Sequence, residues 1–187
     1  MNANTQCFAY IHGLNSDKNS RSCKEIHTLL GSVHDFYYDY TQNASLALAE
    51  IENKLSDVYK NNPNLKLIGS SLGGFFALYL AQKYQLSCTV FNPVTFPSEQ
   101  LAPFKGKNHN FYTNREWNLT DEILQSYARL PLSTDMKLMP AIVLGLNDET
   151  VSPLVTIHFW KHHAKILLTN EEHSITNYQK YLSLLKK

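Results

Sequence analysis

The stretch LIGSSLGGFF, from Leu67 to Phe76, places two serines among glycines between two apolar runs. The run before it is typical of a buried strand, and the run after it indicates a helix that is apolar nearly all round. Residues 69–73 match the pattern G-x-S-x-G with Ser71 at the centre. Where a strand turns sharply into a helix, the central residue is strained, so its neighbours two positions away must be small. The motif predicts that Ser71 is an exposed nucleophile.

Ser70 fits this pattern less well, because its next glycine comes three residues later. Two other interpretations of the motif are a glycine-rich turn needed only for packing and a phosphate-binding loop. The second is disfavoured because no lysine follows the glycines. If Ser71 is the nucleophile, the N–H of Leu72 opens the following helix and is the expected first donor of an oxyanion hole.

Composition sets the class of protein. The chain has 187 residues, of which 43% are hydrophobic and 18% charged, as in a single globular domain spanning 1–187. The net charge of +1 gives no reason to expect nucleic acid or an anionic membrane as a partner. No apolar run approaches the roughly 20 residues of a membrane span. Three scattered cysteines and no recognisable signal peptide predict a cytoplasmic protein.

Short β-rich runs alternate with segments of helical period. This alternation predicts an α/β fold with a mostly parallel sheet of about six strands and helices on both faces. Strands are expected at 7–11, 33–40, 65–69, 87–92, 141–146 and 164–169, and helices at 20–30, 45–60, 72–84, 121–130, 152–163 and 175–185. Residues 95–139 are too many for a plain connection, so we expect a short, lid-like helical insertion over one end of the sheet.

A serine nucleophile needs a base, and the base needs a group that fixes its tautomer. In this fold the expected order along the chain is serine, acid, histidine, with the last two on loops after later strands. Asp148 follows the strand expected at 141–146, and Glu149 is its main rival. Among eight histidines, only His173 combines this order with a position just past a strand. We therefore predict the catalytic set Ser71, Asp148 and His173.

The first expected strand ends at His12-Gly13. A main-chain N–H in the loop that follows, that of Leu14, is the expected second oxyanion donor, and His12 is expected to support the loop. No cofactor and no metal are expected. His158 and His162 are four apart but lack the H-E-x-x-H pattern, and the cysteines are scattered along the sequence.

Five segments recur in the order and spacing of a known family: IHGLNSD (11–17), IGSSLGGFFA (68–77), VFNPVTFP (90–97), LNDETV (146–151) and EEHSI (171–175). They resemble the small bacterial α/β-hydrolase family of YqiA/YcfP-like esterases (UPF0227-like). The resemblance covers essentially the whole chain and implies a minimal α/β-hydrolase with Ser71 as nucleophile, Asp148 as acid and His173 as base. The chain departs from the esterase-like members in carrying NEEH where they have a glycine and a polar residue before the histidine.

The expected function is that of a serine hydrolase that cleaves a small-molecule ester or acyl thioester through an acyl-enzyme. Two alternatives stay open: an amidase or aminopeptidase on the same scaffold, and a non-catalytic binding or regulatory protein. The insertion carries aromatic residues that could form an acyl-accepting wall or simply pack the insertion onto the sheet: Phe96, Phe104, Phe111, Tyr112 and Trp117. Its basic residues Lys105, Lys107 and Arg115 could meet an anionic leaving group.

Overall fold

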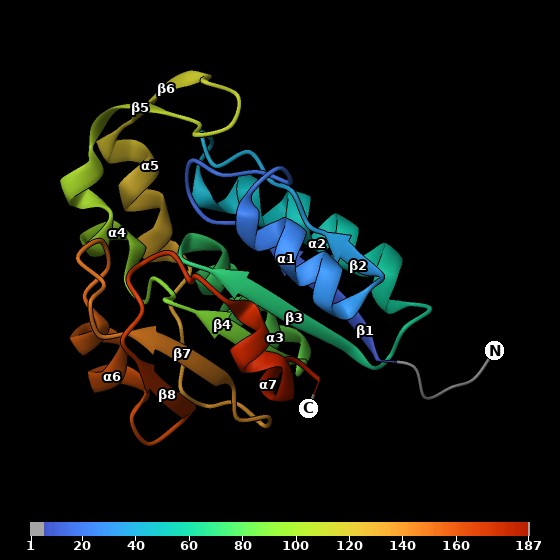
Figure 1. The fold of residues 1–187 in the computed structure, drawn as a ribbon. Coiled ribbons are helices and arrows are strands. Elements are labelled where there is room, and N and C mark those ends of the chain that lie inside the picture. Colours follow the sequence, from blue (N-terminus) through green and yellow to red (C-terminus); the bar gives the residue numbers. More distant parts are fainter. Residues whose placement is uncertain (1–5, 187) are drawn as a thin grey trace.

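The structure is a computed structural model, and it describes residues 6–186. A six-stranded sheet with the strand order β2-β1-β3-β4-β7-β8 lies at its centre (Figure 1). The strands are β1 (Cys7–Ile11), β2 (Val33–Asp35), β3 (Leu65–Ser70), β4 (Ser87–Phe91), β7 (Ala141–Gly145) and β8 (Lys165–Thr169). Every neighbouring pair in this sheet is parallel. The expected α/β architecture is confirmed.

Helices cover both faces of the sheet (Figure 1). One face carries α1 (Arg21–Leu30), a 3-10 turn at Tyr178–Tyr181 and α7 (Leu182–Leu185), and the other carries α2 (Ala44–Tyr59), α3 (Leu72–Tyr84) and α6 (Pro153–Trp160). In β1, Phe8 and Tyr10 are buried in the cluster that includes α1, whereas Ala9 and Ile11 are buried in the cluster that includes α2 and α3. Side chains alternate because successive residues of a strand point to opposite faces.

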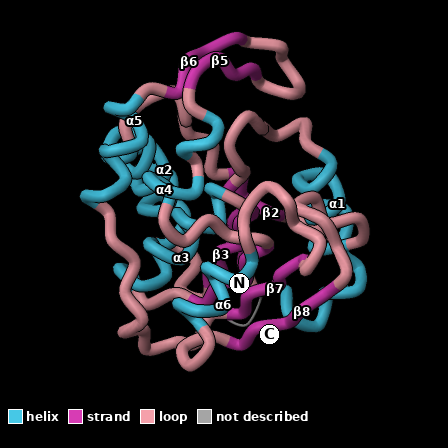
Figure 2. Tube along the Cα trace, turned by 90° about the vertical axis from the view of Figure 1, so that its left-hand side faces the viewer, coloured by secondary structure: helices cyan, strands magenta, loops and turns pink. Residues whose placement is uncertain are grey.

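The insertion lies beyond the carboxyl ends of the central strands (Figures 1 and 2). It contains α4 (Pro97–Gln100), a 3-10 turn at Ala102–Phe104, the antiparallel pair β5 (Gly106–His109) and β6 (Glu116–Leu119), α5 (Asp121–Ser126) and a 3-10 turn at Tyr127–Arg129. The hairpin was not expected, because GKNH and EWNL are short and polar and lack an apolar alternation. The expected helix over 121–130 is divided into an α-helical and a 3-10 part.

Three other elements differ from expectation by more than one residue. The strand expected at 33–40 ends at Asp35, because Tyr38 leaves the sheet to stack on His12, with ring centroids 4.7 Å apart. The helix expected to reach residue 163 ends at Trp160. The C-terminal helix begins only after Asn177, whose side chain accepts a hydrogen bond from Gln179 N, and it is divided into a 3-10 turn and α7. Within residues 6–186, no helix combines the length and apolar character needed to cross a bilayer.

Candidate active site

Ser71 occupies the turn between β3 and α3, with φ 53° and ψ −123°. Positive φ is rare for a residue with a side chain and indicates a strained main chain. A Cβ on Gly69 would lie 2.4 Å from the carbonyl oxygen of Gly73, and one on Gly73 would lie 2.1 Å from that of Ile11. Only glycine fits at either position. The sharp turn expected from the G-x-S-x-G motif is therefore present, for the steric reason that the motif implies.

The two serines of the motif differ in their surroundings. The Ser70 hydroxyl is hydrogen-bonded to the hydroxyl of Tyr10 at 2.9 Å. Ser71 is held through its main chain instead: its N–H donates to Phe91 O at 3.0 Å, and its carbonyl accepts from Val94 N at 3.1 Å. Its side chain makes no capping hydrogen bond to α3. The end of β4 thus fixes the backbone at position 71, and the hydroxyl is not used for holding the turn.

Asp148 and His173 are brought together from loops after β7 and β8. His173 Nδ1 lies 2.8 Å from Asp148 Oδ2. The other carboxylate oxygen of Asp148 accepts hydrogen bonds from the N–H groups of Thr150 and Val151, at 2.9 and 2.8 Å. Asp148 is buried, whereas Glu149, the alternative candidate for the acid, is exposed. A carboxylate held in this way keeps the proton of the imidazole on Nδ1 and leaves Nε2 as the proton acceptor.

The loop that carries His173 is fastened by Asn92, which follows β4 with φ 43°. The Asn92 amide nitrogen donates to the carbonyls of Glu172 and His173 at 2.9 and 2.8 Å, and its oxygen accepts from Gly145 N at 2.7 Å. Sequence reasoning gave Asn92 no role of its own. The available signal was an asparagine followed by proline directly after a buried strand.

Glu171 fastens the same loop on its other side. Its buried carboxylate accepts a hydrogen bond from Thr176 N at 2.9 Å and pairs with Lys180 Nζ at 3.0 Å. Burial by itself raises the pKa of Glu171, but the bonds from Thr176 and Lys180 outweigh it and lower the pKa to about 2. Gly145 lets the loop approach, since a Cβ there would lie 2.2 Å from Glu171 O. His173 therefore sits on an anchored loop.

The loop after β1 lies against the serine. A Cβ on Gly13 would lie 3.2 Å from Ser71 Cβ, and Leu14 lines the same cavity as Ser71. His12 is buried, its Nδ1 is 2.9 Å from Gly13 O, and its carbonyl accepts a hydrogen bond from Tyr38. Burial lowers the pKa of His12, so the ring is neutral and supports the loop. Leu72, the other expected donor, is the first residue of α3.

Asn15 connects this loop to the β5–β6 hairpin. Its side-chain oxygen accepts a hydrogen bond from Trp117 Nε1 at 2.7 Å, and its nitrogen donates to Asn108 Oδ1 at 2.9 Å. Its carbonyl accepts from Phe111 N at 2.9 Å. Asn15 has φ 58°, a conformation that asparagine tolerates better than most residues. Asn15 thus links the insertion to the expected oxyanion loop, and Asn110 Nδ2 adds a hydrogen bond of 3.4 Å to Ser16 O.

The three residues of the predicted catalytic set, Ser71, Asp148 and His173, all line one cavity of about 960 Å³. Of the aromatic residues expected in an acyl-accepting wall, Phe104, Phe111 and Tyr112 line this cavity. The other two serve packing, since Phe96 contacts the Phe159 ring and Trp117 contacts the Tyr40 ring, each with centroids 5.3 Å apart.

A parallel sheet with a serine on a strained strand-to-helix turn, and an Asp–His pair on loops after later strands, defines the α/β-hydrolase fold class. Residues 7–187 match the family described as "Uncharacterised protein family (UPF0227)", and the chain belongs to this family. The family expected from the sequence motifs is therefore confirmed.

Solved structures with the same fold include several esterases and hydrolases. Est1E from Butyrivibrio proteoclasticus is similar with a TM-score of 0.71 and 15% identity, over 97% of this chain and 86% of that one. Alpha/beta hydrolase domain-containing protein 10 from mouse has a TM-score of 0.70 and 13% identity, over 97% and 88% of the two chains. The esterase domain of a Rhodothermus marinus protein has a TM-score of 0.67 and 17% identity, over 97% and 85%.

Proposed function

We propose that this protein is a serine hydrolase that cleaves carboxylic ester or acyl thioester bonds, with Ser71 as nucleophile, His173 as base and Asp148 as the acid that orients it. The observation that carries the proposal is the 2.8 Å contact between His173 Nδ1 and Asp148 Oδ2 in the cavity onto which the strained Ser71 turn opens. A strained main chain costs free energy, and such strain is concentrated at sites where it presents a side chain for function.

In the proposed reaction, Ser71 Oγ forms a bond to the substrate carbonyl carbon while His173 Nε2 takes the hydroxyl proton. The N–H groups of Leu72 and Leu14 bind the oxyanion of the tetrahedral intermediate. When the intermediate collapses, the bond to the leaving group breaks and His173 gives that group the proton. A water molecule, deprotonated by the same imidazole, then attacks the acyl-enzyme, and the carboxylic acid leaves as Ser71 regains its proton.

The lining of the cavity favours an uncharged substrate with an apolar group. The carboxylates of Glu149 and Glu172 line the cavity beside Asp148, and an anionic leaving group would be repelled there. Two basic residues of the insertion are paired outside the cavity: Lys105 pairs with Asp121 at 2.6 Å, and Arg115 lies 3.9 Å from Asp39. This distribution favours neutral esters over thioesters that carry phosphates.

The domain organisation is part of the proposal. Residues 1–187 act as one hydrolase domain, and the insertion 95–139 covers the site and supplies its acyl wall. The hydrogen bonds of Asn15 to Trp117 and Asn108 support this role, because they tie the hairpin to the loop beside Ser71. Any opening of the insertion has to break them.

A fluorophosphonate probe tests the nucleophile, because it reacts covalently with an activated serine. We expect labelling of the wild-type chain, loss of labelling in Ser71→Ala, and retention in Ser70→Ala, the matched control from the same motif. A wild type that is not labelled, beside a hydrolase that is, would favour the non-catalytic alternative. Labelling that survives in Ser71→Ala would show that another residue is the nucleophile.

A substrate panel then separates the reaction types. Neutral p-nitrophenyl esters, acyl-coenzyme A thioesters and aminoacyl anilides should be compared by kcat/KM. We expect the esters to be cleaved best, and Ser71→Ala and His173→Ala to lower kcat by about 10³-fold or more while the fold is retained. Preferential cleavage of the anilides would establish the amidase alternative instead.

A further inference from the structure

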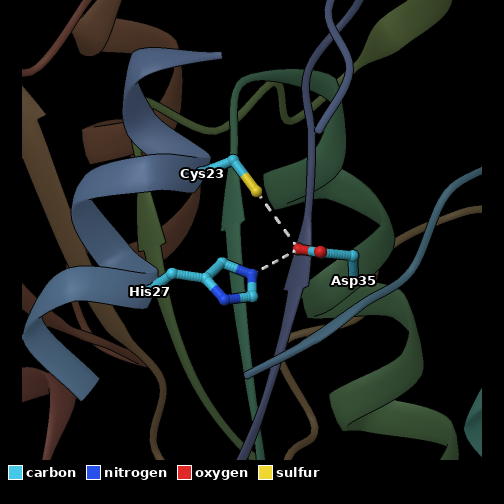
Figure 3. Close-up of side chains that lie close together, drawn as sticks. All are labelled: Cys23, His27 and Asp35. Carbon is cyan, nitrogen blue, oxygen red and sulfur yellow. Dashed lines mark hydrogen bonds and ion pairs between the residues drawn. The ribbon is translucent and has the colours of Figure 1, made fainter. Parts of the chain in front are cut away.

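Three potential metal ligands meet between α1 and the edge strand β2: Cys23, His27 and Asp35 (Figure 3). One ligand atom of each lies within 4.8 Å of the others, and this is the only such group among residues 6–186. Cys23 and His27 are four residues apart, so they share one face of α1. Asp35 is the last residue of β2, paired in register with Tyr10 of β1. His158 and His162, the pair with metal-ligand spacing in the sequence, are not part of it.

The side chains already point at one place. A single oxygen of the Asp35 carboxylate accepts a hydrogen bond from Cys23 Sγ at 3.1 Å and contacts His27 Nε2 at 2.9 Å (Figure 3). The other oxygen accepts from the hydroxyl of Tyr37 at 2.9 Å. A second contact of this kind commonly orients a carboxylate that ligates a metal. Sulfur, nitrogen and oxygen donors therefore converge, and the hydroxyl of Tyr37 orients the carboxylate of Asp35.

We propose that Cys23, His27 and Asp35 bind a zinc ion. Around tetrahedral zinc, with bonds of about 2.0 Å to nitrogen or oxygen and about 2.3 Å to sulfur, ligand atoms lie roughly 3.3–3.6 Å apart. The contacts of 2.9 and 3.1 Å at Asp35 have to widen by only about half an ångström to admit the ion. The sulfur of Cys23 and a ring nitrogen of His27, the third pair of ligand atoms, lie within 4.8 Å of each other.

The charges balance. The thiolate of Cys23 and the carboxylate of Asp35 together neutralise a divalent cation, and His27 binds as a neutral ring through Nε2 with its proton on Nδ1. The thiol proton leaves to solvent as the sulfur–zinc bond forms. Water takes the fourth position, on the side where the side chains of His27 and Asp35 are 35% and 20% exposed. Cys23 is buried and forms the floor of the site.

A bound ion would join α1 to a strand of only three residues at the sheet edge. The group is separate from the residues that line the Ser71 cavity. The expected consequence is therefore stability of the α1–β2 unit, and the inference stands independently of the proposed hydrolase reaction. The alternative is a hydrogen-bonded network that has no affinity for metal, with Asp35 as its shared acceptor.

Cobalt titration distinguishes the two, because Co²⁺ replaces Zn²⁺ in such sites and reports its ligands by absorption. The untagged full-length chain, reduced and stripped with a chelator, is titrated with Co²⁺ and then with Zn²⁺. We expect one ion per chain, a thiolate-to-cobalt charge-transfer band, the intense visible bands of a four-coordinate ion, and displacement by Zn²⁺. A wild type that shows no charge-transfer band overturns the proposal.

Matched variants assign the ligands. Cys23→Ser should remove the charge-transfer band. Mutation of a residue that hydrogen-bonds a metal ligand typically weakens metal binding by roughly 10–100-fold, and His27→Gln and Asp35→Asn, which remove a ligand, should weaken it by more. Tyr37→Phe should fall within that smaller range. Cys7→Ser and His34→Gln change the same residue types outside the group and should bind as the wild type does.

A thermal shift gives a second readout that does not depend on activity. Zn²⁺ should raise the melting temperature of the wild type and of Cys7→Ser, since a ligand stabilises the state that binds it, and should not raise that of Asp35→Asn. This comparison also covers the case in which Cys23→Ser does not fold. A charge-transfer band that persists in Cys23→Ser, or equal Zn²⁺ shifts in the wild type and Asp35→Asn, overturns the assignment.

Discussion

The side-chain amide of Asn92 donates a hydrogen bond of 2.8 Å to the main-chain carbonyl of His173. The same amide donates to Glu172 O and accepts from Gly145 N, and Asn92 is buried. One side chain at the end of β4 therefore holds the loop after β8 against the end of β7. Because an imidazole is positioned by the loop that carries it, Asn92 is a positioning residue for the proposed base.

Asn92→Ala should lower kcat for ester hydrolysis by up to about 10²-fold and leave KM nearly unchanged, because a displaced base affects the chemical step more than binding. Asn147→Ala is the matched control: its amide also bonds the loop after β8, at Asn170 O, but from an exposed position. Steady-state kinetics of both variants check this. Equal kcat values in the two variants would contradict the positioning role.

Ser71→Gly should be more stable than Ser71→Ala by about 1 kcal/mol, although both should lack esterase activity. The main chain at position 71 has φ 53°, which glycine adopts at little cost and alanine does not. Urea unfolding of the two variants measures the difference. Greater stability of the alanine variant would mean that the turn is not strained in solution.

Trp117→Phe should lower kcat about tenfold while the protein stays folded. The variant keeps an aromatic ring against Tyr40 but loses the N–H that bonds Asn15, so the loop beside Ser71 is held less firmly. Trp160→Phe is the contrasting change: among the described residues the buried Trp160 N–H has no hydrogen-bond partner. That variant should lose stability by leaving a void in the core, with kcat unchanged. The reverse pattern in kinetics and melting temperature would refute this prediction.

Lys66→Met should raise the free energy of unfolding at pH 7. Lys66 is buried on β3, and burial lowers its pKa to about 8, against about 10.4 in an unfolded chain. Between these values the unfolded state binds the proton more tightly, so the stability of the wild type rises with pH through this window. The advantage of the methionine variant should therefore shrink from pH 8 to pH 10.

The carbonyl that Lys66 bonds, Leu184 O, keeps its hydrogen bond from Thr89 Oγ1 at 3.1 Å in that variant. Lys107→Met, at an exposed position, is the control and should show no such pH dependence. Chemical denaturation at several pH values provides the measurement. An advantage that is constant or grows with pH would contradict the assigned cause.

The central strands of the sheet were largely predictable because β1, β3, β4 and β7 are short runs whose side chains are mostly buried on both faces. β1 was predicted with its observed bounds, and β7 to within one residue. The strand expected at 33–40 was too long, because Tyr38 and Tyr40 have strand-like propensity but pack around His12 instead. The β5–β6 hairpin was missed, since its polar strands are positioned by Asn15 and Asn110 and not by an apolar pattern.

A local pattern of amino acids was enough to locate the serine turn. A side chain at Gly69 or Gly73 would collide with atoms only a few residues away or in the adjacent strand. The requirement for glycine at these two positions is therefore visible as a short sequence motif. Chain order in a parallel sheet also pointed to Asp148 and His173, because the carboxyl ends of parallel strands share one edge.

Three arrangements required the folded chain: the Asn92 contact with His173, the Asn15 contact with Trp117, and the meeting of Cys23 with Asp35. Each joins different elements of the fold through the orientation of side chains, and packing in three dimensions sets that orientation while the spacing of residues along the sequence does not.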